Sequence, residues 1–327
     1  MEFIVANEKE QTVVKTRKIV PPEYLTIKLS SLGKLSVPHV LHFRDYSVDD
    51  AMKIGLTTDD NILETLVGIL NGMIYEEFDC NNLHESELEE IMLNIFANFW
   101  GVMLRDYPFP FTNEEYNALP EETKEKYKKN FPKVDISLKK LSNKLIPDQF
   151  KEPFKISNDK VEVKFMLPRV GHIFIATDYC EKKYMKEEQL FHKIAEAVKY
   201  NNNTEDESKH KPIDSAELVE YSKYLKIRME DYLNCQRSFT IVKYGDKDLK
   251  DVSIEERIGF YKKISFQMWS IVAKVFEDMS FGIDHDIEVI SPIDKKPTIR
   301  RFSFRPLDFV PGGELPDNNG YVVTFGE

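Results

Sequence analysis

The stretch GIDHDIEVISPIDKKPTIRRFSFRPLDFVP, from Gly282 to Pro311, predicts two short strands joined by a polar turn. Ser291 and Asp294 lie at the tip of this hairpin. A small zinc-binding hairpin carries a Cys-x-x-Cys pair there, which supplies two of the four metal ligands. A serine and an aspartate without further ligands hold zinc poorly, so we expect neither a metal nor another cofactor. We expect the hairpin to be stabilised by packing of its apolar side chains on the preceding helix.

Two further hairpins are predicted from alternating apolar and polar residues. The first follows Tyr24, with a turn at Gly33, and the second lies in the middle of the chain around VEVKFML, residues 161–167. Together with the hairpin after Gly282, they place β-structure near the N-terminus, in the middle and near the C-terminus of the chain.

About five substantial helices are predicted between these hairpins, because apolar residues recur there at helical spacing. Capping boxes mark three of their starts, at Ser86-x-x-Glu89, Asp214-x-x-Glu217 and Ser253-x-x-Glu256. The predicted helices cover approximately residues 59–74, 86–100, 177–198, 214–232 and 253–279. Strands do not alternate with helices, so the sequence predicts a helix-dominated α+β fold and no doubly wound sheet.

These patterns predict that the chain has five parts. Residues 1–23 are polar and form a flexible N-terminal segment, and 24–105 hold the first hairpin and a helical hairpin. Residues 106–153 are rich in proline, which prevents a long helix, and form an insertion or linker. Residues 154–281 form a strand and helical region, and 282–327 form the C-terminal hairpin unit and tail.

Composition limits the classes of partner. The 327 residues include 45 basic and 56 acidic side chains, a formal net charge of −11, which repels nucleic-acid phosphates. No apolar run approaches the length of a membrane-spanning helix, and the N-terminus resembles no signal peptide. The three cysteines lie far apart in the sequence and indicate buried thiols in a reducing compartment. We therefore expect neither nucleic acid nor membrane as a partner.

Catalytic motifs are weak. Neither a phosphate-binding loop nor a GxSxG or HExxH motif is present. Asp284-His285-Asp286 combines two carboxylates with an imidazole, but alternation along a strand places His285 on the opposite face from the two aspartates. The acidic run ESELEE, residues 85–90, is explained by the preference for acids in the first turn of a helix. We therefore expect no enzyme, with a metal-dependent enzyme using Asp284, His285 and Asp286 as an alternative.

Several segments, in order along the chain, resemble the baseplate hub assembly proteins of T-even-type contractile-tailed bacteriophages. The first is LSSLGKLSVPHVLHFRDYSVDDAMKI, residues 29–54, and the second is the Leu-Pro-x-x-Gly turn at residues 167–171. The third is the unit from Gly282, which ends in Arg-Pro-x-x-Phe-x-Pro at residues 305–311. Relatives often carry a Cys pair where this chain has Ser291 and Asp294.

The resemblance implies a non-enzymatic tail protein that binds other phage tail or baseplate hub proteins. It would act as a chaperone or component of hub assembly in the host cytoplasm, or remain in the virion baseplate as a structural subunit. Residues at the matching positions are the candidates for partner binding: Arg44, Asp50, Arg305 and Phe309. The aromatic residues Phe302 and Phe304 are interpreted as core rather than interface. The particular hub partner, the oligomeric state, the host and the role of residues 106–153 stay open.

Overall fold

The computed structural model describes residues 20–57, 61–202, 204 and 209–304. Helix accounts for 48% of the structure and strand for 18%, which confirms a mixed α and β class in which helix predominates. The number of about five helices is wrong, because the described residues contain nine α-helices. Three short helices lie outside the five predicted ranges, and the predicted helix at 253–279 is two helices.

The elements have the following bounds. The strands are β1 (Leu25–Lys28), β2 (Val40–Phe43), β3 (Met103–Pro108), β4 (Lys133–Ser137), β5 (Asn143–Lys144), β6 (Phe154–Ser157), β7 (Glu162–Phe165), β8 (Ile241–Tyr244), β9 (Lys247–Asp248), β10 (Gly282–Ile283), β11 (Asp286–Ile290) and β12 (Pro297–Arg301). The helices are α1 (Val48–Gly55), α2 (Ile62–Met73), α3 (Glu85–Phe99), α4 (Asn113–Ala118), α5 (Glu121–Lys129), α6 (Val170–Asn202), α7 (Ser215–Ser238), α8 (Ile254–Tyr261) and α9 (Phe266–Asp278), with single 3-10 turns at Cys80–Asn82 and Leu138–Lys140.

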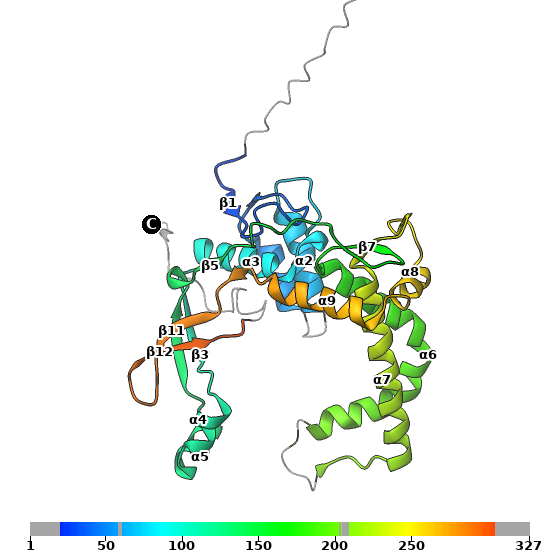
Figure 1. Ribbon diagram of the computed structural model, residues 1–327. Coiled ribbons are helices and arrows are strands. Elements are labelled where there is room, and N and C mark those ends of the chain that lie inside the picture. Colours follow the sequence, from blue (N-terminus) through cyan, green and yellow to red (C-terminus); the bar gives the residue numbers. More distant parts are fainter. Residues whose placement is uncertain (1–19, 58–60, 203, 205–208, 305–327) are drawn as a thin grey trace, which may run out of the picture.

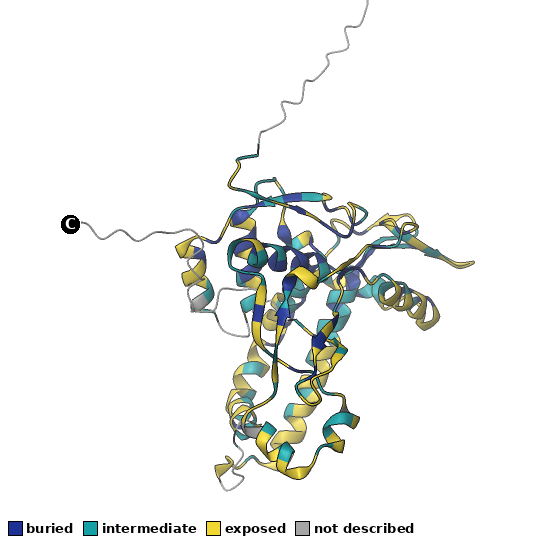
Figure 2. Ribbon diagram, turned by 90° about the vertical axis from the view of Figure 1, so that its left-hand side faces the viewer, coloured by how far each residue is buried: buried dark blue, intermediate teal, exposed yellow. Residues whose placement is uncertain are grey.

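A central body holds most of the core, and two projections extend from it (Figure 1). The body combines the antiparallel β1–β2 hairpin with α2 and α3, and its largest core cluster also includes residues of β4, β10 and β11. One projection is the β3–β4 hairpin with α4 and α5 between its strands, and the other is the antiparallel pair α6 and α7. Buried residues are concentrated in the body, whereas the projections are mostly exposed (Figure 2).

The predicted middle and C-terminal hairpins are present. Strands β6 and β7 belong to a four-stranded antiparallel sheet with the order β6-β7-β8-β9, and β11 pairs with β12. The predicted boundary at residue 106 falls inside β3, and the proline-rich residues up to 153 contain β3–β4, α4, α5 and β5. The helices α4 and α5 have only 6 and 9 residues, in agreement with the prediction that proline prevents a long helix here.

Helix α3 begins differently from the predicted capping box at Ser86. His84 is the N-cap: its ring nitrogen Nδ1 accepts a hydrogen bond from the Ser86 amide at 3.1 Å, and Glu87 accepts one from the His84 amide at 2.9 Å. Burial lowers the pKa of His84 to about 4, so the ring is neutral and its nitrogen is free to accept. Sequence rules favour serine at an N-cap and do not anticipate a buried histidine.

The acidic run at residues 85–90 is more than a helix start. Glu87 and Glu90 are completely buried. The Glu90 carboxylate accepts hydrogen bonds from the Ser30 amide at 3.0 Å and the Ser30 hydroxyl at 2.8 Å, and one from the Asn143 amide group. Glu90 therefore joins α3 to the turn after β1 and to β5.

A buried ion pair joins the residues just before α6 to other parts of the core. Arg169 and Glu152 form an ion pair in which both side chains are 2% exposed. The Arg169 guanidinium also donates to the Leu35 carbonyl at 2.7 Å, and the Leu167 amide donates to Glu152. Three segments that are distant in sequence are thereby joined inside the core.

Helix α6 begins at Val170, seven residues before the predicted start near Thr177. The His172 ring accepts a hydrogen bond from the Arg169 amide at 3.2 Å, which satisfies a donor ahead of the helix. A Cβ atom at Gly171 would lie 2.9 Å from the Asn81 carbonyl oxygen, so a glycine is required for this close approach. The glycine of the Leu-Pro-x-x-Gly turn is therefore inside the helix, where it permits packing against the turn before α3.

The predicted helix at residues 253–279 is interrupted after Tyr261. Ser253 caps α8 as predicted, with its side chain accepting from the Glu256 amide at 3.3 Å. Ser265 caps α9 by accepting from the Met268 amide at 3.2 Å. A second capping serine therefore starts a new helix where apolar spacing alone indicated continuity.

Candidate functional site

The turn of the C-terminal hairpin is completed by protein hydrogen bonds. The Ser291 hydroxyl accepts from the amides of Ile293 at 3.2 Å and Asp294 at 3.5 Å, and the Asp294 carboxylate accepts from the Lys296 amide at 3.3 Å. Lys295 has a φ of 60°. The side-chain oxygens of Ser291 and Asp294 thus accept hydrogen bonds from backbone amides of the turn. Across the described part of the chain, no group of three or more metal-ligating side chains is found.

The apolar side chains of this hairpin contribute to the main core. Ile287, Val289 and Phe302 are buried, and Phe304 is partly buried against the same cluster. The Tyr107 ring of β3 lies edge-on to Phe302 and Phe304, with ring centroids 5.9 and 5.6 Å apart. The hairpin therefore packs on the β3–β4 hairpin. Packing on the preceding helix, α9, stays a prediction.

The side chains of Asp284, His285 and Asp286 have separate partners. The Asp284 carboxylate accepts from the Asp286 amide at 3.1 Å, which closes a local turn. The His285 ring lies 3.3 Å from Glu89 through Nε2 and 2.9 Å from the Phe302 carbonyl through Nδ1. The arrangement attaches the C-terminal hairpin to α3 through His285.

A pH dependence follows from this attachment. The hydrogen bond to Glu89 raises the pKa of His285, so protonated His285 stabilises the fold below pH 6.5, and this stabilisation is lost as the pH rises through the higher folded-state pKa. We expect His285→Gln to lower the free energy of unfolding by about 0.5–1 kcal/mol near pH 6 and by less near pH 8. Urea denaturation at both pH values measures this. His192→Gln, at the exposed His192–Glu196 pair 3.6 Å apart, is the control; an equal effect of both variants would contradict the role of His285.

Two of the four predicted partner-binding residues contact each other. Arg44 Nη1 lies 2.7 Å from Asp50 Oδ2, and Asp50 also forms a reciprocal capping box with Ser47 at the start of α1. Asp50 is buried and Arg44 is partly exposed. Arg305 and Phe309 lie outside the described residues. Partner binding by these four residues stays a prediction.

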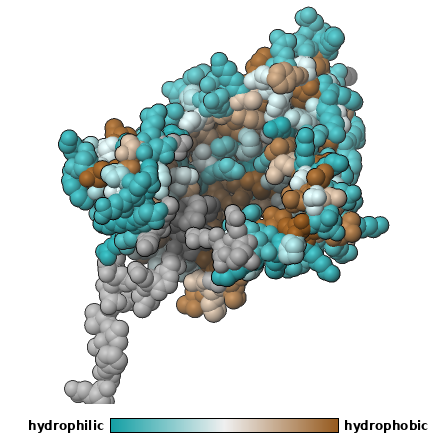
Figure 3. Space-filling model, turned by 90° about the horizontal axis from the view of Figure 1, so that it is seen from below, coloured by the Kyte–Doolittle hydropathy of each residue, from teal (hydrophilic) through white to brown (hydrophobic). Residues whose placement is uncertain are grey.

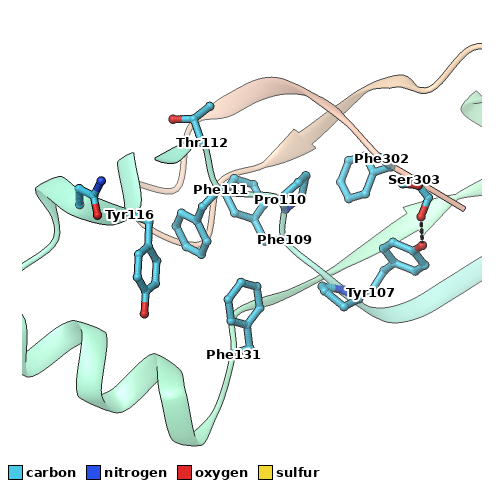
Figure 4. A pocket seen from close by; sticks show the side chains of 11 residues that line it. Tyr107, Phe109, Pro110, Phe111, Thr112, Tyr116, Phe131, Phe302 and Ser303 are labelled. Atoms are coloured by element: carbon cyan, nitrogen blue, oxygen red, sulfur yellow. Dashed lines mark hydrogen bonds between the residues drawn. The ribbon is translucent and has the colours of Figure 1, made fainter. Parts of the chain in front are cut away.

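A cavity of about 480 Å³ lies where the β3–β4 projection meets the C-terminal hairpin. Figure 4 shows aromatic rings from both segments around it. We call it the aromatic pocket. Its lining residues are Tyr107, Pro108, Phe109, Pro110, Phe111, Thr112, Tyr116, Asn117, Phe131, Phe302 and Ser303.

The sequence PFPFT, residues 108–112, forms one wall of the aromatic pocket. Thr112 caps α4 and ends the extended segment, with its hydroxyl accepting from the Glu115 amide at 3.2 Å. The Phe111 ring lies 5.1 Å from Phe109 and 5.6 Å from Phe131, both edge-on. Aromatic pairs at these separations stabilise one another beyond their burial, so the wall has a defined shape.

Polar contacts hold the two halves of the pocket together. The Tyr107 hydroxyl donates to the Ser303 carbonyl at 2.6 Å (Figure 4), and Arg300 forms an ion pair with Glu115. The Arg300 guanidinium also lies 5.6 Å from the centre of the Phe109 ring. The pocket therefore exists only where residues about 190 positions apart meet, and the hairpin at Gly282 forms one side of it.

The aromatic pocket is suited to an apolar side chain. Of its lining residues, Phe109 and Phe302 are buried, whereas Phe131 is 41% exposed. Rings that are partly exposed and rigidly held are typical anchors for protein partners. The interpretation of residues 106–153 as an insertion missed this site; alternation of proline and phenylalanine at 108–111 was the available signal.

Comparisons with known proteins find no significant match: no family model, no curated protein and no solved structure matches the chain. Along the described parts of the chain, every helix is too short or too polar to cross a lipid bilayer.

Proposed function

We propose that the chain is a non-enzymatic protein that assists assembly of the baseplate hub of a contractile-tailed bacteriophage by binding another tail protein. The aromatic pocket is the observation that carries this proposal. The order of the segments that resemble hub assembly proteins supplies the kind of partner. The host cytoplasm during phage assembly is the corresponding location.

The pocket favours an apolar, aromatic or prolyl side chain of a partner protein. Buried aromatic anchors contribute most of the binding energy of protein interfaces, and their neighbours exclude water. On the side toward which both projections point in Figure 1, the surface carries apolar patches among hydrophilic side chains (Figure 3). A partner surface that contacts both projections would bury such patches.

Two buried groups with strongly shifted pKa values lie outside the aromatic pocket. Burial lowers the pKa of His172 to about 3 and raises that of Glu87 to about 7, but neither residue lines the aromatic pocket. The three cysteines, Cys80, Cys180 and Cys235, are buried, and burial raises the pKa of each thiol.

The test is capture of the tagged chain from infected cells, followed by identification of the proteins that co-purify. The proposal expects a baseplate hub protein. Mass spectrometry of purified virions separates a chaperone from a retained subunit, because a chaperone is absent from the particle. Capture of no tail protein by the chain contradicts the proposal.

Phe131→Asp is expected to weaken binding of the captured hub protein by about 10-fold to 100-fold, because it places a charge at the edge of an apolar anchor site. Titration of the purified partner measures the loss. Phe266→Asp is the matched control, since Phe266 begins α9 and is 87% exposed outside the pocket. Equal affinities of wild type and Phe131→Asp would show that the pocket is not the binding site.

A further inference from the structure

The projection formed by α6 and α7 has little core of its own. Helix α6 has 33 residues, about 50 Å of helix. Beyond Cys180, only Tyr184 and Ala197 of α6 are buried, and α7 has no buried residue before Cys235. Helices acquire most of their stability from packing of an apolar face, so the outer part of this projection lacks a packing partner.

One face of the projection contains an apolar groove. The groove has a volume of about 350 Å³, and its apolar lining consists of Phe191, Ala195, Tyr221, Tyr224 and Leu225. The Phe191 and Tyr224 rings stack with their centroids 5.2 Å apart. This stacking keeps the base of the groove in a defined shape.

An apolar ridge borders the same groove. Leu218, Leu225 and Met229 follow one another at i, i+7 and i+11, which places them on one side of α7. Their exposed fractions are 40%, 42% and 57%. Leu225 also lines the groove, so ridge and groove are neighbours on one surface. A surface with both a ridge and a groove can pair with itself across a two-fold axis.

The charge of the projection is compatible with contact between two copies of the chain. Helix α6 contains five acidic and five basic residues, and α7 contains four of each, so neither helix carries a formal net charge. The whole chain has a net charge of −11. The projection is therefore a region of an acidic chain where the helices of two copies can approach without a net charge repulsion between them.

We infer that two copies of the chain associate through α6 and α7. The ridge of Leu218, Leu225 and Met229 from each copy lies in the groove of the other, and the four helices form a bundle. The packing of apolar ridges into grooves is the usual way in which such bundles form. This association is independent of the aromatic pocket and does not rest on the proposed function.

The test is the oligomeric state of the full chain, measured by sedimentation velocity up to about 100 µM, where an association of useful strength is populated. Wild type is expected to be a dimer. The double variant Leu225→Glu/Met229→Glu is expected to raise the dimer dissociation constant by about 30-fold or more, because two charges enter each apolar contact. Circular dichroism shows whether each variant is folded.

Ile227→Glu is the matched control. Ile227 is 55% exposed and lies on the same helix, about half a turn away from the ridge. This variant is expected to remain a dimer. A monomeric wild type would overturn the inference, and the groove would then serve a different partner protein. A wild-type dimer that dissociates in Ile227→Glu but persists in the double variant would also overturn it.

Discussion

Replacing Arg169 with methionine is expected to lower the free energy of unfolding by about 3–5 kcal/mol, the largest effect among the substitutions considered. The variant removes the cation that pairs with Glu152 inside the core, where both side chains are 2% exposed. Burial already raises the pKa of Glu152, so its carboxylate is costly without Arg169. The hydrogen bond to the Leu35 carbonyl is lost as well.

Urea denaturation of Arg169→Met and wild type measures this difference. Lys182→Met is the control, because it removes an exposed ion pair with Asp178 on α6 and is expected to change stability by less than about 0.5 kcal/mol. The double variant Arg169→Met/Glu152→Gln is expected to recover part of the loss, since it leaves no unpaired charge. A loss below about 1 kcal/mol in Arg169→Met would contradict the importance of the pair.

Replacing Glu87 with glutamine is expected to make the free energy of unfolding depend less on pH. The difference in this free energy, variant minus wild type, should increase as the pH rises. Burial raises the pKa of Glu87 from 4.5 to about 7. Between these values the folded chain binds more protons at Glu87 than the unfolded chain, so wild type loses stability with rising pH. Glutamine resembles the protonated carboxyl at every pH. The stability of Glu87→Gln relative to wild type should therefore increase by about 2–4 kcal/mol from pH 4.5 to above 7.

The comparison of the two proteins is essential for this measurement. The buried histidines His84 and His172 have lowered pKa values, about 4 and about 3, and they destabilise the folded state as the pH falls below 6.5. Wild type alone thus shows a sum of opposite slopes, which the difference between variant and wild type cancels. Glu64→Gln is the control at an exposed position in α2. An unchanged difference between about pH 5 and pH 8 would exclude the proposed shift at Glu87.

Patterns of neighbouring residues predicted the hairpins and helix caps, because these are formed by residues close together in the sequence. Alternation and turn residues located the three hairpins, and Asp214 caps α7 where it was expected, accepting from the amides of Ala216 and Glu217. These features depend on backbone conformation and on side chains within a few residues. Apolar spacing continues across the break between α8 and α9, so it does not predict the new helix start at Ser265.

The candidate site was only partly visible in the sequence. Phe302 was assigned to the core, and its low exposure of 2% agrees with that. Its position beside Phe109 in one pocket depends on contacts between the C-terminal hairpin and the proline-rich region, such as that from Tyr107 to Ser303. No local pattern contains information about such a pair.

By itself, the sequence determined that this chain forms a helix-rich α+β fold with a hairpin after Gly282 that has Ser291 and Asp294 at its tip. Tertiary structure alone decided that the hairpin packs on the β3–β4 projection, that His285 contacts Glu89, and that an aromatic pocket lies beside Phe302. The physical reason is range: hydrogen bonds of caps and turns act between near neighbours, whereas burial and ion pairing depend on which distant segments meet.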